Sequence, residues 1–132
     1  MHWEEITHRM PGPGRVDSDF GAFTIASDHP PEFDREGRAP EPWNQFLASI
    51  GSCMASFVMA YCAKHELPYG DIEIVQRQKR EEGELHFREI SVEIRVPDEF
   101  PPEHREALAE EARGCTVKRV IENAPEFHIR TT

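Results

Sequence analysis

The segment from Pro42 to Ala63 contains no Asp, Glu, Lys or Arg, although charged residues make up 30% of the chain. So long an uncharged run in so charged a sequence indicates an element that is shielded from water. Cys53 stands in the middle of the segment. The sequence therefore places a thiol inside a buried element, and the role of that thiol decides what the protein does.

Apolar residues in this segment recur at helical spacing. One stripe has steps of three and four, and a second stripe lies beside it; they comprise Phe46, Ile50, Cys53, Phe57 and Tyr61, and Leu47, Met54, Val58 and Cys62. This pattern predicts a helix from Pro42 to about Leu67 that is apolar on more than one face. A single sheet can cover only one of those faces, so we expect a second subunit to cover the other.

The same segment is long enough to span a bilayer. It contains Asn44, Gln45 and three serines and has no flanking basic cluster, so we expect the buried helix of a soluble protein and no membrane contact. The N-terminus lacks the apolar core of a secretory signal, which predicts a cytoplasmic protein. Three widely spaced cysteines do not suit a disulfide framework, and we expect them to be thiols.

Composition bounds the remaining possibilities. The chain has 132 residues, which suits one domain covering residues 1–132. With 25 acidic and 15 basic residues the formal net charge is -10, which disfavours nucleic acid as a partner. Seven histidines and three cysteines are scattered without an HExxH or CxxC motif, so no metal site is expected. A GxSxG motif and a glycine-rich phosphate loop are also missing from the sequence.

The rest of the chain predicts an α+β domain with an antiparallel sheet, one long buried helix and one amphipathic helix. Alternating apolar residues and turn residues predict strands, and proline and glycine bound the helices. The expected elements are a hairpin or two short strands over 15–27, strands within 71–80 and 85–96, a helix over 102–113, a short helical run over 115–124 and a final strand over 127–131.

Four stretches together resemble the OsmC/Ohr family, the osmotically induced and organic-hydroperoxide-resistance proteins. They are PWNQFLASIGSC (Pro42–Cys53), ELPYGDIEI, ARGCTVKR (Ala112–Arg119) and the tail APEFHI. The likeness extends from about Gly14 to the end of the chain. It implies an OsmC-like fold and an intertwined homodimer, with two central helices packed between sheets and two active sites at the subunit interface.

The resemblance also implies a chemistry. Cys53 would be the peroxidatic thiol, which reduces an organic hydroperoxide and becomes a sulfenic acid, and Cys115 would resolve that acid to a disulfide. An external dithiol, such as a lipoylated protein, would then reduce the disulfide, without any bound cofactor. An ordinary thiol titrates near about 8.5, and Cys53 lies beyond the reach of its own helix dipole, so we expect a nearby cation to stabilise the thiolate.

In the family an early arginine supplies that cation, and Arg15 is its best match. The family holds this arginine with a glutamate just after the helix-starting proline, but here that position is Trp43. The nearest acids are Glu41, the candidate anchor, and Glu32 or Asp34 in the preceding loop.

We expect an apolar substrate pocket formed by Trp43, Phe46 and Phe57, and we expect Cys62 to be a core residue. Two functions remain open. The chain is either a two-cysteine peroxidase or a non-catalytic OsmC-like dimer that binds a small apolar molecule or senses redox state. Close approach of the Cys53 and Cys115 sulfurs would favour the enzyme.

Overall fold

The structure is a computed structural model that describes residues 1–29 and 37–132. Glu32 and Asp34 lie outside these residues. The chain divides into two compact units, Met1–Ala48 (unit 1) and Ser49–Thr132 (unit 2). The expectation of a single domain over residues 1–132 stays a prediction.

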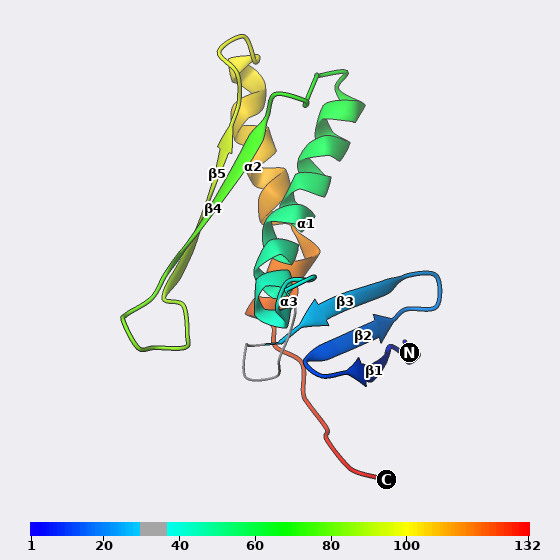
Figure 1. Cartoon of the computed structure of the whole chain (residues 1–132). Helices are drawn as coiled ribbons and strands as arrows, with labels where there is room; N and C mark the ends of the chain where they lie inside the picture. Colours follow the sequence, from blue (N-terminus) through cyan, green and yellow to red (C-terminus); the bar gives the residue numbers. More distant parts are fainter. Residues whose placement is uncertain (30–36) are drawn as a thin grey trace. The chain divides into compact units, whose positions relative to one another are not determined.

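Unit 1 is built on a three-stranded antiparallel sheet in the order β1-β2-β3 (Figure 1). The strands are β1 (Thr7–Gly12), β2 (Arg15–Asp19) and β3 (Thr24–Asp28). The pairing of β2 with β3 confirms the hairpin predicted over 15–27. Gly21 turns between these strands with a φ of 86°, a conformation that favours glycine. The sequence analysis missed β1 because THRMPG has no apolar alternation, so its strand depends on pairing with β2.

Asp28 fixes the segment that leads into the long helix. Its carboxylate is buried and accepts hydrogen bonds from the backbone N–H groups of Arg38, at 2.6 Å, and Ala39, at 3.0 Å. The side-chain amide of Gln45 then donates to the carbonyl of Ala26, at 2.7 Å. These bonds attach the first turn of the helix to β3 and satisfy polar groups that would otherwise be costly to bury.

The predicted long helix is α1 (Pro42–Lys64). It ends slightly before the expected limit because Glu66 adopts a left-handed conformation, with a φ of 55°. The N–H groups of Glu66 and Leu67 donate to the carbonyls of Ala63 and Cys62, as in a Schellman motif. The residues that α1 buries, four apart along one face, are Ile50, Met54, Val58 and Cys62. By length and composition alone, α1 would also suffice to cross a membrane.

Unit 2 packs the rest of α1 against a hairpin and the later helices (Figure 1). Strands β4 (Glu73–Lys79) and β5 (Glu89–Arg95) pair antiparallel along their whole length. A 3-10 turn, η2 (Pro102–His104), precedes α2 (Arg105–Arg113) and α3 (Thr116–Glu122). The core consists of Val58, Cys62, Phe100 and Leu108, with the partly buried Ile72, Ile74, Ile94 and Val96 packed against it. The two strands that apolar alternation predicted within 71–80 and 85–96 are confirmed.

Gly51 on α1 leaves room for a side chain of the hairpin. A methyl group on Gly51 would come within 2.9 Å of the Gln76 side-chain oxygen on β4. Gly51 lies two residues before Cys53 on α1.

The predicted strand over Phe127–Thr131 is wrong. Residues 124–132 contain neither helix nor strand and are exposed. A strand forms only where it can pair, and within the part of the chain that the structure describes the tail joins neither sheet. The apolar alternation in this tail was therefore insufficient to predict a strand.

Replacing Leu108 by Ala tests the core of unit 2. Leu108 is 1% exposed, so the change leaves a cavity among the side chains that hold α1, α2 and the hairpin together. We expect the free energy of unfolding in urea to fall by about 2–5 kcal/mol. The control is Leu85→Ala, since Leu85 is 77% exposed, and it should change stability by less than about 0.5 kcal/mol. Equal effects of the two changes would contradict this core.

Candidate active site: the Cys53 and Cys115 thiols

The two cysteines singled out by the sequence come together in unit 2. Cys53 lies on α1, Cys115 directly precedes α3, and each thiol shifts the pKa of the other. Both are free thiols. Cys53 is half-buried and Cys115 is fully buried. The pair therefore consists of one thiol that solvent can reach and a second, enclosed thiol in contact with it.

The junction between α2 and α3 positions Cys115. Helix α2 closes at Gly114, whose N–H donates to the carbonyl of Glu111, and Cys115 donates in the same way to Ala112. Cys115 then adopts an extended conformation, with φ -52° and ψ 129°, before α3 begins at Thr116. Its sulfur lies 3.9 Å from the carbonyl oxygen of Ile50, about one turn before Cys53 on α1. The start of α3 is thus held against α1.

Hydrogen bonds at this junction make Cys53 more acidic than an ordinary thiol. Burial raises the pKa of Cys53, but hydrogen bonds from the Val117 amide, the Cys115 side chain and the Thr116 amide outweigh it, and the pKa is lowered. The two amides are the first of α3, where backbone N–H groups have no partner within the helix. A thiolate at Cys53 is therefore stabilised by donors that are already in place.

Cys115 shifts in the opposite direction. Burial is the largest cause of its raised pKa, and the hydrogen bond to Cys53 and the charge of the Cys53 thiolate raise it further, against the lowering effect of the Lys118 and Val117 amides. The pKa values of the two thiols thus shift in opposite directions, and Cys53 is the more acidic of the two. This division suits an attacking thiol and a resolving thiol.

The sequence analysis expected a cation to stabilise the Cys53 thiolate. Two backbone amides of a second helix are among the causes that lower the pKa of Cys53, and the role of a cation stays a prediction. The relevant signal was present in the sequence, because Gly114 and Cys115 interrupt the helical pattern immediately before TVKRVIE. What the sequence could not give was the proximity of that helix start to Cys53.

Arg15 has a carboxylate partner that the sequence analysis missed. Its Nε atom lies 2.7 Å from an oxygen of Asp17, two residues along β2, and both side chains are about two-thirds buried. Residues two apart on a strand share a face, so the RVD sequence itself carries this signal. Arg15 belongs to unit 1 and Cys53 to unit 2. The role of Arg15 beside the thiol, and that of Glu41 as its anchor, stay predictions.

Two of the three residues predicted to form an aromatic pocket lie together. The rings of Trp43 and Phe46 stack with centroids 5.4 Å apart near the start of α1, and both are partly exposed. Phe57 is half-buried and belongs to unit 2. The three-residue pocket stays a prediction. Cys62 is fully buried in the core, and burial raises its pKa, as suits a structural thiol.

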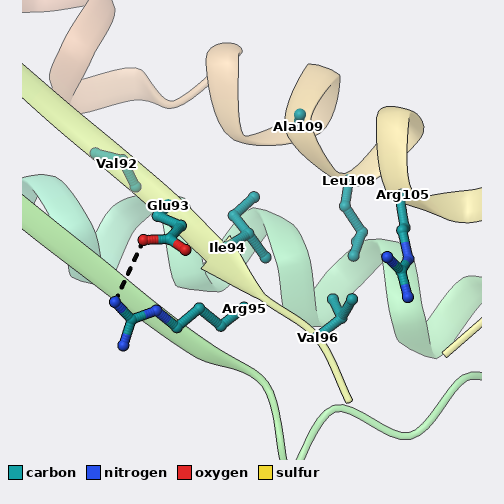
Figure 2. Close-up of a pocket in the computed structure, with 8 residues that line it drawn as sticks. All are labelled: Val92, Glu93, Ile94, Arg95, Val96, Arg105, Leu108 and Ala109. Atoms are coloured by element: carbon teal, nitrogen blue, oxygen red, sulfur yellow. Dashed lines mark hydrogen bonds and ion pairs between the residues drawn. The ribbon is translucent and has the colours of Figure 1, made fainter. Parts of the chain in front are cut away.

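A hollow of about 390 Å³ lies between β5 and α2 (Figure 2). Ile94, Val96 and Leu108 give it an apolar lining, while Arg105 and the ion pair between Glu93 and Arg95 add charge. Its lining includes neither thiol of the pair. Among the described residues no group of three or more His, Cys, Asp or Glu could hold a metal ion. The two thiols are therefore the chemical groups on which the candidate site rests.

The fold is that of a known protein family. The family model for OsmC-like proteins matches residues 35–130, so this chain belongs to the OsmC family. That finding confirms the resemblance drawn from the sequence motifs. No curated protein matches the chain.

Solved structures with this fold support the assignment. An osmotic stress induced and detoxification response protein from Psychrobacter arcticus 273-4 matches with a TM-score of 0.70 at 16% identity, covering 90% of this chain and 88% of the other. An OsmC-like protein from Mycoplasma pneumoniae matches with a TM-score of 0.67 at 16% identity, covering 93% and 89%. The organic hydroperoxide resistance protein OhrB of Bacillus subtilis matches with a TM-score of 0.53 at 18% identity, covering 91% and 90%. The predicted α+β fold with antiparallel sheets and a long central helix is confirmed.

The acidity of Cys53 can be measured by alkylation. Because hydrogen bonds lower its pKa, the thiolate forms at lower pH than in a free thiol. We expect the rate of iodoacetamide labelling at Cys53, followed by peptide mass spectrometry, to reach its plateau at a lower pH than that of N-acetylcysteine. Labelling of Cys62 in the folded chain should be slow throughout and serves as the internal control. If the labelling rate of Cys53 reached its plateau at the same pH as that of N-acetylcysteine, or at a higher pH, the lowered pKa of Cys53 would be contradicted.

Proposed function

We propose that this protein is a thiol-dependent peroxidase that reduces organic hydroperoxides, with Cys53 as the peroxidatic and Cys115 as the resolving thiol. The observation that carries the proposal is the hydrogen-bonded pair in which Cys53 is the more acidic thiol. Family membership supports it, since the similar solved structures include organic hydroperoxide resistance proteins from Legionella pneumophila and Bacillus subtilis.

In the first step the Cys53 thiolate attacks the outer peroxide oxygen. A sulfur–oxygen bond forms, the oxygen–oxygen bond breaks, and the alkoxide leaves and takes a proton to become an alcohol. Sulfur is oxidised by two electrons, and the peroxide is reduced by two. The product is a sulfenic acid at Cys53. Because Cys53 is half-buried, substrate can reach the sulfur, and only part of the sulfur's surroundings is open to water.

The second step uses the enclosed thiol. The Cys115 sulfur attacks the Cys53 sulfur, a disulfide forms, and the hydroxyl group of the sulfenic acid leaves as water. The charge of the Cys53 thiolate contributes to the raised pKa of Cys115. Once Cys53 is a neutral sulfenic acid, that contribution vanishes and Cys115 ionises more readily. The order of the two steps thus follows from the electrostatics of the pair.

An external dithiol completes the cycle by exchange with the disulfide, and no bound cofactor is required. We propose a lipoylated protein as the dithiol because the family chemistry uses such a reductant. Arg15, held by Asp17, is the proposed cation at the peroxide, and Trp43, Phe46 and Phe57 are the proposed apolar walls.

We propose further that the working form is a cytoplasmic homodimer. Helix α1 has no charged residue before Lys64 and buries four residues among those that the structure describes, so part of its apolar surface is exposed there. Met59, Phe46 and Trp43 on α1 are each about 40% exposed or more. A second copy packed on this helix would remove that surface from water.

Peroxide consumption tests the function. The full chain should consume cumene hydroperoxide with dihydrolipoamide as reductant, and Cys53→Ser should reduce turnover to the background rate. Cys62→Ala is the matched control, because Cys62 is also a cysteine on α1 but lies in the core, and it should keep turnover within about threefold of the unchanged chain.

The resolving role is tested separately with Cys115→Ser. This variant should still consume about one equivalent of peroxide, because Cys53 remains, but should form no intramolecular disulfide and should turn over slowly with dihydrolipoamide. Unchanged turnover in Cys53→Ser would reject the peroxidase. If no dithiol supports consumption by the unchanged chain, the non-catalytic OsmC-like dimer is the better account.

A further inference from the structure

Two histidines and a tyrosine gather where α1 ends beside η2, apart from the thiol pair. The hydroxyl of Tyr61 lies 2.6 Å from Nδ1 of His104. The ring of His65 lies over Tyr61, with centroids 4.2 Å apart, and 5.1 Å from the ring centroid of His104. All three residues belong to unit 2. Tyr61 follows Cys53 by eight residues of helix, a rise of about 12 Å, so the cluster is separate from the reacting sulfurs.

The spacing of the two imidazoles suits a shared metal ion. Nitrogens bound at about 2.0–2.1 Å and near-tetrahedral angles place two imidazole centroids about 5 Å apart. The observed separation between His65 and His104 is 5.1 Å, with the rings inclined at 53°. The separation of the two ring centroids therefore matches that of two imidazoles on one ion.

The tyrosine orients one of these ligands. When Nδ1–H of His104 donates to the Tyr61 oxygen, Nε2 carries the lone pair that a metal requires. Metal-binding histidines usually engage their second nitrogen in this manner, which fixes the tautomer and the ring. Contact between the Tyr61 and His65 rings restrains the other ligand. Tyr61 is thus a positioning residue for both imidazoles.

We propose that His65 and His104, positioned by Tyr61, bind one divalent transition metal ion of the class that prefers imidazole, such as Zn²⁺, Ni²⁺ or Cu²⁺. His65 is exposed and His104 is half-buried, which leaves a path for the ion, and waters complete its coordination. The net charge of -10 favours the approach of cations. Cys62, three residues before His65, lies in the core, and the structure brings His65 to His104.

Nickel is a suitable probe because Ni²⁺ prefers imidazole and does not oxidise thiols under these conditions. In the unmodified full chain, substoichiometric Ni²⁺ should broaden the imidazole NMR resonances of His65 and His104 before those of the other histidines. Calorimetric titration of Ni²⁺ into the full chain carrying Cys53→Ser, which removes the acidic thiol as a ligand, should give one ion per chain.

Single variants in that Cys53→Ser background identify the ligands. His65→Ala and His104→Ala should each abolish stoichiometric binding, and Tyr61→Phe should weaken it about 10-fold. His86→Ala is the matched control, since His86 is an exposed histidine of the same unit, and it should leave affinity unchanged.

Two results would overturn the site. One is broadening by Ni²⁺ that reaches other histidines first. The other is stoichiometric binding that persists in both His65→Ala and His104→Ala. The NMR arm uses the unmodified chain, so a variant that fails to fold cannot decide the matter.

Discussion

The interaction on which the site depends is the set of hydrogen bonds that the first amides of α3 donate to the sulfur of Cys53. Helix α3 begins at Thr116, and the residue before it, Cys115, makes no side-chain capping hydrogen bond. The leading N–H groups of a helix need partners from outside it. A sulfur from another helix supplies the partner. One contact therefore satisfies the start of α3 and lowers the pKa of Cys53, so packing and reactivity have the same origin.

That contact requires the rest of unit 2 to hold the start of α3 beside Cys53 on α1. Val58 and Cys62 on α1 pack with Leu108 on α2, and the short junction at Gly114 carries this arrangement into α3. Close to Cys53, Gly51 leaves room for the Gln76 side chain of the hairpin. The uncharged character of α1 is thus partly explained by the core that it forms and partly by the surface that it leaves for a second subunit in the proposed dimer.

Local patterns predicted much of the fold. Apolar residues four apart on α1 and two apart on β4 and β5 follow the geometry of one helix or one strand, so the sequence alone reveals them. The strand over Phe127–Thr131 failed because pairing depends on a neighbour, which alternation cannot supply. Cys53 and Cys115 were found through family motifs. The α3 amides were missed because helix proximity is a tertiary property, and Asp17 was missed although it lies two residues from Arg15.

The central claim is that Cys53 and Cys115 form one redox pair. The most direct measurement treats the reduced chain with one equivalent of cumene hydroperoxide, blocks the remaining thiols, and maps the peptides by mass spectrometry without reduction. The account predicts that Cys53 and Cys115 are joined in a single disulfide and that Cys62 alone is recovered blocked. Recovery of Cys53 and Cys115 as blocked thiols, or a disulfide that includes Cys62, would contradict it.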